Sequence, residues 1–130
     1  MFSHVFVSVG DFEAAVGFHS AIMDILGHEC RFCDTSKPWA GWHSNDGARP
    51  FFVICHAFNG ELHSPGNGQM LAFEAQSRDQ VRRCHQKALE LGGKCEGPPG
   101  LRPHYHENYY GAYFRDPDGN KFCVVCHYPE

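Results

Sequence analysis

The stretch YGAYFRDPDGNK at residues 110–121 decides the fold of this chain. It reads as an aromatic strand that enters a tight turn and continues, after the turn, as a further strand. Pro117 presets the turn, Gly119 tolerates a positive φ, and the aspartates and Asn120 can hydrogen-bond the local backbone. We therefore expect the two aspartates to stabilise the turn rather than to act in catalysis.

The first half of the chain reads as one strand, one helix and three further strands. Residues 2–9 alternate apolar and polar side chains, as a strand does. An apolar stripe at helical spacing follows, between a cap at Asp11 and a stop at Gly27. Three extended segments then fit residues 28–34, 38–43 and 49–57. Asn45, Asp46 and Gly47 supply turn residues before the last of these segments.

The second half repeats this order. A strand fits residues 69–75, and Ser77 with Gln80 forms a capping box for a helix that stops at Gly92. Extended segments fit residues 94–97, 109–115 and 121–127. A shift of 66 residues superposes the strand starts (4 and 70), the helix caps (11 and 77) and the helix ends (27 and 93).

This repeat predicts an α+β fold in a single domain. Two βαβββ modules, residues 1–57 and 69–130, are joined by a polar, glycine-rich linker at residues 58–68. Each helix covers one face of its strands, so we expect two modules side by side to form a curved mixed sheet around a common cleft. Alternation along the first strand of each module places His4 and Glu74 on the cleft side.

Composition and charge restrict the class of protein. The 130 residues are 42% hydrophobic and 20% charged, as in a globular domain. Eleven Lys and Arg against 15 Asp and Glu give a net charge of −4, which offers no basic surface for nucleic acid or an anionic membrane. No apolar stretch approaches the roughly 20 residues of a membrane span, and the first residues lack the features of a signal peptide. We expect a soluble cytoplasmic protein.

Seven cysteines and ten histidines are a large number for this length. Without a secretory signal the cysteines need not form disulfides, and we expect mostly buried, reduced thiols. The CxxC spacings at residues 30–33 and 123–126 invite a zinc-ribbon or redox interpretation. Both lie on expected strands, where residues three apart point to opposite faces, so the two thiols of one pair do not easily share an ion.

The turn stretch and the duplicated module together resemble the vicinal oxygen chelate superfamily, which groups glyoxalase I, bleomycin-resistance proteins, fosfomycin-resistance enzymes and extradiol dioxygenases. The resemblance covers nearly the whole chain, and the Asp-Pro-Asp-Gly-Asn turn is its most specific part. It implies the glyoxalase/bleomycin resistance/dihydroxybiphenyl dioxygenase fold. It also implies a homodimer, because proteins of this kind are commonly dimers.

The resemblance further implies a divalent metal in the cleft, held from the first strand of each module and from the last strand. The usual ligands are His or Gln, His, and Glu, and these positions hold His4, Met70 and Cys123 here. Met70 is a poor ligand for Mg²⁺ or Mn²⁺. A ligand pair of His4 and Cys123 suits Zn²⁺ or Ni²⁺ better. The alternative is a hydrogen-bonded cleft histidine and a small buried strand cysteine.

A thiol beside an imidazole is a further hypothesis for the last strand. Cys123 and His127 share a face of that strand, which is the cleft side if Cys123 occupies the ligand position. An adjacent imidazole could activate the thiol as a nucleophile.

The segment GPPGLRPHYHENYY at residues 97–110 is the most distinctive stretch outside the turn. Its prolines and glycines predict a shaped loop rather than a strand. At a cleft mouth this loop suits an anionic or aromatic ligand, because Arg102 can pair with a carboxylate and tyrosines can stack and donate. Alternatively, the last tyrosines start a strand and Arg102 makes a surface pair. The candidate ligand-binding residues are His43, Arg102, His104, His106, Tyr109, Tyr113 and His127.

The leading functional hypothesis is a glyoxalase-like lyase or isomerase acting on a small polar substrate, such as a thiol conjugate. In such chemistry a metal polarises a carbonyl and a carboxylate moves a proton, and Glu74 is the candidate carboxylate. The alternative is a metal-free, ligand-sequestering protein of the bleomycin-resistance type, which the loss of two usual ligands favours. An extradiol dioxygenase needs two His and one carboxylate for Fe(II), and Met70 and Cys123 disfavour it.

Overall fold

The computed structural model describes residues 1–44 and 47–130, so Asn45 and Asp46 of the expected turn lie outside the described residues. The chain divides into two compact units, Met1–Pro65 and Gly66–Glu130. Each unit contains one helix and one four-stranded mixed sheet in the order βαβββ, which confirms the predicted α+β fold of two repeated modules. No helix in the described part of the chain has the length and apolarity needed to cross a membrane.

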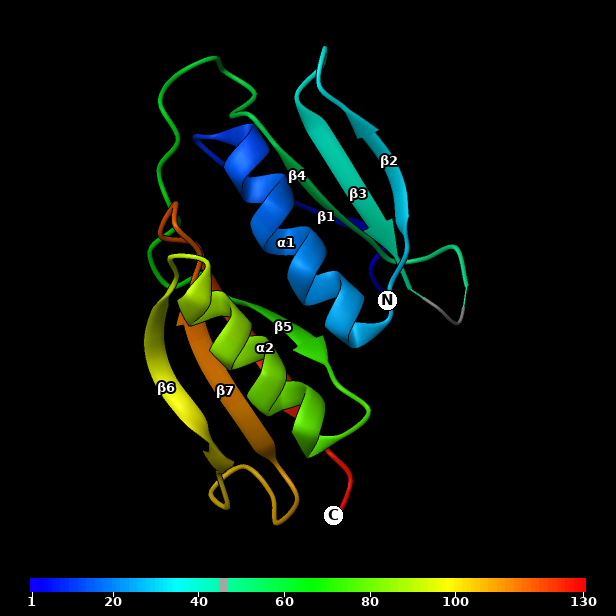
Figure 1. Cartoon of the computed structure of the whole chain (residues 1–130), viewed down its shortest axis with the longest axis vertical. Coiled ribbons are helices and arrows are strands. Elements are labelled where there is room, and N and C mark those ends of the chain that lie inside the picture. The colour runs from blue at the N-terminus through cyan, green and yellow to red at the C-terminus, as the bar shows by residue number, and fades with distance from the viewer. Residues whose placement is uncertain (45–46) are drawn as a thin grey trace. The chain divides into compact units, whose positions relative to one another are not determined.

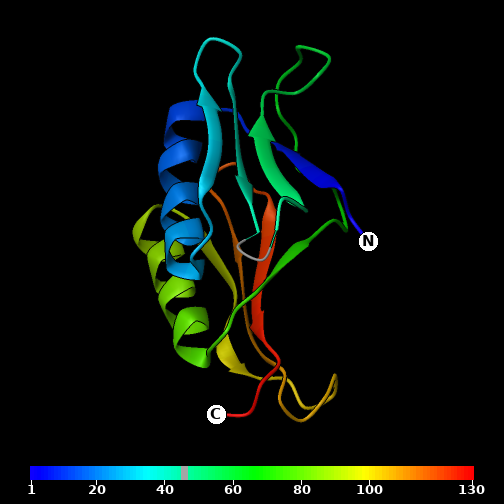
Figure 2. The ribbon, with the colours of Figure 1, turned by 90° about the vertical axis from the view of Figure 1, so that its right-hand side faces the viewer.

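The first unit is a four-stranded sheet with its helix packed on one face (Figure 1, Figure 2). Its elements are β1 (His4–Ser8), α1 (Phe12–Leu26), β2 (Cys30–Asp34), β3 (Trp39–His43) and β4 (Phe51–Cys55). The strands lie in the order β1-β4-β3-β2. β1 runs parallel to β4, and the other neighbours are antiparallel.

Helix α1 begins and ends where the sequence predicts. The Asp11 carboxylate accepts a hydrogen bond from the backbone N–H of Ala14 at 3.1 Å, and Gly27 ends the helix at a left-handed φ of 82°. His19 is the one polar member of the buried stripe. It is 1% exposed, and its ring lies 5.3 Å from that of Phe52. The stripe consists of Phe12, Ala15, Phe18, His19, Ile22, Met23 and Leu26.

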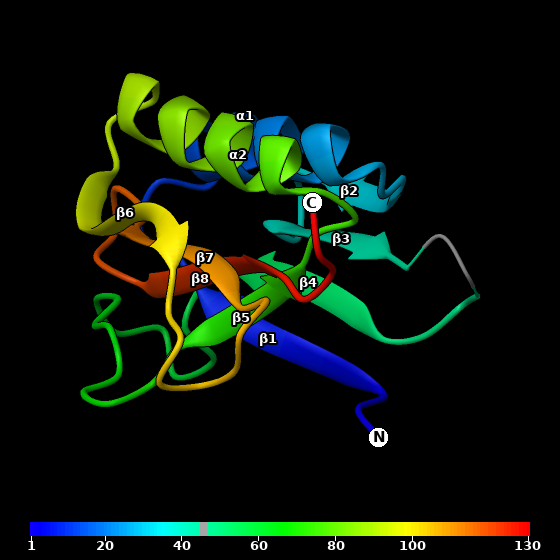
Figure 3. The same cartoon turned by 90° about the horizontal axis from the view of Figure 1, so that it is seen from below.

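The second unit repeats the element order of the first (Figure 3). Its elements are β5 (Leu71–Glu74), α2 (Arg78–Glu90), β6 (Lys94–Leu101), β7 (Tyr110–Arg115) and β8 (Lys121–Cys126). The strand order is β5-β8-β7-β6, with β5 parallel to β8. Helix α2 packs on β6, β7 and β8.

Helix α2 begins at the predicted cap and ends just before Gly92. The Ser77 hydroxyl accepts from the Gln80 N–H at 3.2 Å as expected. The Gln80 side chain also accepts the N–H of Gln76 at 2.7 Å. Leu91 follows the last helical residue, Glu90, and is 42% exposed.

The prediction of a loop is wrong for residues 97–101, which continue β6. β6 is the edge strand of its sheet and pairs only with β7, with two register shifts along the pairing. Pro98 and Pro99 fit this strand because an edge strand with bulges does not need every backbone N–H in the ladder. The loop begins after Leu101 and carries most of the candidate ligand-binding residues.

The tight turn between β7 and β8 is built around Asp116, which is 3% exposed. Its Oδ1 accepts the backbone N–H groups of Asp118 at 3.0 Å and Asn120 at 2.9 Å, and its Oδ2 accepts the Asn120 side-chain amide at 3.1 Å. Gly119 has a φ of 87°, which an L side chain rarely adopts. The prediction that these aspartates stabilise the turn is confirmed for Asp116.

Candidate functional site

The register of the second sheet sorts its side chains by face. The Tyr110 ring of β7 lies against the guanidinium groups of Arg78 and Arg82 of α2, so this residue and every second one after it face the helix. Tyr113 therefore points to the opposite face, and its register partner Cys123 points the same way. We call the side of β7 and β8 opposite α2, with the loop residues that contact it, the tyrosine face.

Three hydrogen-bonded groups form the centre of the tyrosine face. The Tyr109 and Tyr113 hydroxyl oxygens are 2.9 Å apart, and the Tyr109 hydroxyl lies 3.7 Å from Cys123 Sγ. Cys123 is 0% exposed, while both tyrosines are half-buried. Burial is the main cause that raises the pKa of Tyr109, Tyr113 and Cys123, so all three are protonated at neutral pH.

A count of hydrogens shows what this cluster can offer a ligand. It holds two O–H hydrogens and one S–H hydrogen, and its contacts join Tyr109 to Tyr113 and both hydroxyls to the Cys123 thiol. Because a hydroxyl hydrogen rotates, either tyrosine can turn its hydrogen toward an acceptor outside the cluster. A carboxylate or carbonyl oxygen is such an acceptor.

Two cations lie over the same tyrosine ring. The Arg102 guanidinium carbon is 5.5 Å from the Tyr113 ring centroid, and Lys121 Nζ is 5.8 Å from it. Arg102 is fixed by its own strand, since its Nη atoms donate to the carbonyls of Pro98 at 2.7 Å and Gly100 at 2.8 Å. Its remaining N–H donors and its charge can still face an anion.

Arg115 contributes less charge to this face because Glu96 neutralises it. The Arg115 Nε donates a short hydrogen bond to the Glu96 carboxylate, and one Nη donates to the carbonyl of Gly119 at 2.8 Å. This hydrogen bond is the main cause that lowers the pKa of Glu96. Lys121 also lowers the pKa of Glu96 through its charge, whereas Arg102 lies within ion-pair distance of no carboxylate in the described part of the chain.

The loop histidines form a directional chain at the edge of the cluster. The Asn108 N–H donates to His106 Nδ1 at 3.1 Å, so that nitrogen is an acceptor. His106 Nε2 then carries the ring hydrogen and donates to His127 Nδ1 at 2.8 Å, an assignment made from the donors around the rings. A metal bound at His106 Nε2 would replace this hydrogen and so break the contact with His127. The ring hydrogen would then lie on Nδ1, which could no longer accept from Asn108. The pair fits a hydrogen-bonding role better than a chelating one.

Aromatic contacts extend the chain along the loop. The His106 and His127 rings each lie against Tyr109, at 5.7 Å and 5.5 Å between centroids. Tyr105 lies 4.8 Å from Tyr109 on its other flank and 4.3 Å from His104. The structure therefore brings together all of the candidate ligand-binding residues of the second half.

The candidate residues of the first unit are dispersed. Val5 pairs with Phe52, which faces α1, so His4 lies on the opposite face with its partner Phe51. The His4 Nδ1 is 2.9 Å from the Ser3 hydroxyl. His43 Nδ1 is 3.0 Å from the Ser44 carbonyl, and its Nε2 is 3.9 Å from the Glu29 carboxylate.

The donors at the three family metal positions do not fit a divalent ion. Cys123 Sγ is buried and hydrogen-bonded to Tyr109, and its raised pKa keeps it a thiol rather than the thiolate that binds metals. Met70 is a 45% exposed thioether, a soft and weak ligand. Within residues 1–44 and 47–130, no three His, Cys, Asp or Glu side chains are grouped as a metal site requires.

The expected pairing of Cys123 with His127 is absent from the described contacts of either residue, because Cys123 bonds Tyr109 and His127 bonds His106. The structure instead pairs His85 of α2 with Cys95 of β6, at 3.2 Å between Nε2 and Sγ. The sequence carries no signal for this pair, because its members lie on different elements with no shared motif. Lys121 does have a signal in the sequence, since strand alternation from Cys123 places it on the same face.

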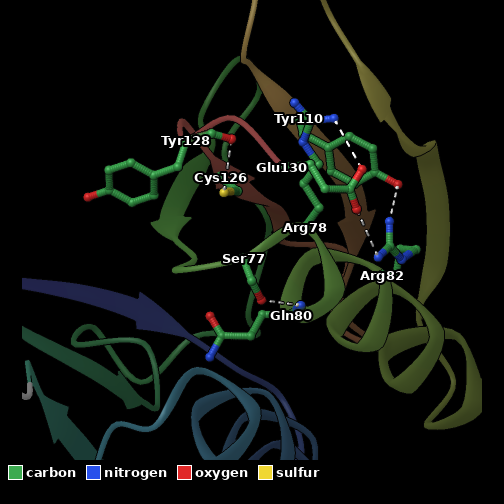
Figure 4. Close-up of polar contacts among 8 residues, drawn as sticks. All are labelled: Ser77, Arg78, Gln80, Arg82, Tyr110, Cys126, Tyr128 and Glu130. Carbon is green, nitrogen blue, oxygen red and sulfur yellow. Dashed lines mark hydrogen bonds and ion pairs between the residues drawn. The ribbon is translucent and has the colours of Figure 1, made fainter.

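A second polar cluster lies on the helix side of β7 (Figure 4). The Glu130 carboxylate is 3.7 Å from Arg78 and 3.9 Å from Arg82, and Arg82 also donates to the Tyr110 hydroxyl at 3.2 Å. Both cations thus already have an anionic partner, and the cluster ties the residues after β8 to the start of α2.

Comparison with known proteins places this site in a family. The chain matches the Glyoxalase/Bleomycin resistance protein/Dioxygenase superfamily over residues 1–124. It is 38% identical to a glyoxalase/bleomycin resistance protein from Albidiferax ferrireducens whose crystal structure covers 97% of this chain and 98% of that one, with a TM-score of 0.86. A glyoxalase-related enzyme from Fulvimarina pelagi is 19% identical, covers 97% of this chain and 87% of its own, and shares the fold with a TM-score of 0.72. No curated protein matches the chain.

The family match, the duplicated βαβββ modules and the Asp-Pro-Asp-Gly-Asn turn lead to one conclusion. The chain belongs to the glyoxalase/bleomycin resistance protein/dioxygenase superfamily.

Proposed function

We propose that this chain is a ligand-binding member of its superfamily that works without a metal. Its ligand is a small aromatic molecule with an acidic group, bound on the tyrosine face. The observation that carries this proposal is the placement of Arg102 and Lys121 over the ring of Tyr113, whose hydroxyl lies 2.9 Å from that of Tyr109.

The chemistry of the tyrosine face matches such a ligand at both ends. An acidic group gains from two cations that, within residues 1–44 and 47–130, have no carboxylate at ion-pair distance, and it can accept a hydrogen bond from a tyrosine hydroxyl. An aromatic ring can stack on the exposed edges of Tyr105, Tyr109 or His106. His104 and His127 extend this aromatic rim, so the same residues serve recognition without supplying a reactive group.

A glyoxalase-like lyase or isomerase acting on a small polar or thiol-conjugated substrate is the second candidate. One observation favours it: Glu74 is exposed, and its register partner Val125 shares the face of Cys123. A carboxylate at this place is suited to moving a proton on a substrate held by the tyrosine face. The side chains of the second unit do not suit a metal ion that would assist such a step.

Two measurements separate the candidates. In ¹⁵N-labelled protein titrated with benzoate, we expect saturable shifts of amides around Tyr109, Tyr113 and Cys123. We expect Lys121→Met to weaken benzoate at least about threefold, while the matched control Arg31→Met, an exposed cation of the first unit, leaves the affinity unchanged. Shifts spread over both units, or equal effects of the two substitutions, would contradict the proposal.

The metal is tested on protein purified without a histidine tag. A metal that binds the native state raises the melting temperature by mass action. Since we propose that no metal binds, we expect no rise when Zn²⁺, Ni²⁺ or Mn²⁺ is added. A stoichiometric metal, together with stabilisation that Cys123→Ser abolishes, would favour the lyase candidate instead.

A further inference from the structure

A thiol and an imidazole meet outside the tyrosine face, on the helix side of the second unit. Cys95 Sγ lies 3.2 Å from His85 Nε2, and the two residues come from β6 and α2. Cys95 is exposed at the edge strand, whereas His85 is 8% exposed beneath it. The solvent-accessible thiol of Cys95, a candidate nucleophile, is therefore hydrogen-bonded to the buried imidazole of His85, a candidate base.

The environment of the pair keeps the imidazole available as a base. Burial lowers the pKa of His85, so the ring is neutral at physiological pH and Nε2 can accept the S–H hydrogen when Nδ1 carries the ring hydrogen. Lys94 and Glu96 flank Cys95 in β6, and Glu96 is bound by Arg115. The charge that would most oppose a developing thiolate is thereby neutralised.

The other thiols of the described chain lack this arrangement. Cys30 is exposed, but its S–H donates to the carbonyl of Phe32 at 3.3 Å, and burial with the nearby Cys33 raises its pKa. A carbonyl accepts a hydrogen bond but does not take the proton. Four further cysteines are buried, at positions Cys55, Cys84, Cys123 and Cys126.

We propose that Cys95 is a site of mixed-disulfide formation with low-molecular-weight disulfides, and that His85 acts as its base. His85 Nε2 takes the thiol proton while the sulfur attacks one sulfur of the disulfide, whose S–S bond breaks. The leaving thiolate takes the proton from His85 and departs as a free thiol. The sulfur of Cys95 is oxidised to the mixed disulfide, and the departing sulfur is reduced. This site is independent of ligand binding on the tyrosine face.

The test uses the full chain with oxidised glutathione, followed by intact mass and peptide mapping. We expect Cys95 to be modified first, at a rate at least about tenfold above Cys30 and Cys33. A positioned general base typically raises a rate roughly a hundredfold or more, so tenfold is a low threshold. Equal rates at the three exposed thiols would overturn the proposal. This comparison needs no substitution, so it does not depend on how any variant folds.

Substitution of the base supplies the second readout. In a Cys30→Ser, Cys33→Ser background, we expect His85→Gln to slow modification of Cys95 about tenfold at neutral pH. In the His85→Gln protein, only the small thiolate fraction attacks, so we expect the modification rate to fall about tenfold for each unit that the pH is lowered below neutral. In the protein that keeps His85, we expect a shallower fall. An unchanged rate and pH profile in a folded His85→Gln protein would show that the imidazole only packs against the sulfur.

Discussion

The central strand pairs of the two units, β3 with β4 and β7 with β8, are alike toward the helix and different on the other face. The equivalent helix-facing pairs are Ala40–Ile54 and Ala112–Val124, and Trp42–Phe52 and Phe114–Phe122. Each is an alanine beside a β-branched residue, or two aromatic rings together. All eight side chains are buried at 6% exposure or less, so the shared positions form the cores under the two helices.

On the other face the equivalent pairs are Gly41–Val53 and Tyr113–Cys123. The Phe32 ring fills the space over Gly41, where an added Cβ would meet it at 2.6 Å. The first unit therefore covers this position with an apolar ring, while the second presents a hydroxyl and a thiol. One repeated backbone is thus fixed by its helix-facing side chains, which leaves the opposite face free to carry chemistry.

The largest expected effect comes from breaking the shared core. We expect Phe122→Ala and its counterpart Phe52→Ala each to lower the free energy of unfolding by about 3–5 kcal/mol, because each removes a buried ring and leaves a cavity. Urea unfolding followed by circular dichroism measures the loss. Tyr113→Phe on the opposite face is the control and should cost about 1 kcal/mol or less. A similar loss from all three substitutions would mean that the two faces do not differ as described.

The repeat and the turn could be predicted from the sequence because their signals are local. Caps at Asp11 and Ser77, alternation along strands and the Asp116 turn each depend on neighbouring residues. The strand at residues 97–101 could not, because its prolines are tolerated only through its position at the sheet edge.

The candidate site divides in the same way. The sequence selected Tyr113 and Cys123 as separate candidates, and the pairing of β7 with β8 brings them together. The hydrogen bond of Tyr109 to Cys123, and that of His85 to Cys95, join residues whose proximity depends on strand pairing and helix packing. No local pattern in the chain carries such information.

A smaller effect distinguishes the two helices at high pH. Cys84 of α2 stands, by the 66-residue repeat, where α1 has Phe18. Burial raises the pKa of Cys84 from 9.0 to about 12, so above pH 9 the unfolded chain releases this proton while the folded chain keeps it. Stability present below pH 9 is therefore lost as pH rises. From about 1.4 kcal/mol per pH unit, we expect a loss of about 2 kcal/mol by pH 10.5.

The measurement is urea unfolding of wild type and Cys84→Ala from pH 7 to about pH 10.5. Other groups with raised pKa values, such as Tyr109 and Cys55, lose stability in the same direction in both proteins. The difference in slope therefore isolates Cys84. Parallel pH profiles would show that this thiol titrates alike in the folded and unfolded chain.

The smallest expected effect makes the second unit resemble the first on its chemical face. Cys123→Val installs the residue of the equivalent position, Val53, at a site that is fully buried. The two tyrosine hydroxyls keep their 2.9 Å contact with each other and lose only their contacts with the sulfur, so neither hydroxyl is left unpaired. We expect the free energy of unfolding to change by about 1 kcal/mol or less in either direction. Urea unfolding measures the change, with Val53→Ala in the first unit as the comparison. A loss well above about 1 kcal/mol would mean that the thiol holds the tyrosine pair in place. The faces opposite the helices would then differ between the two units in structure as well as in chemistry.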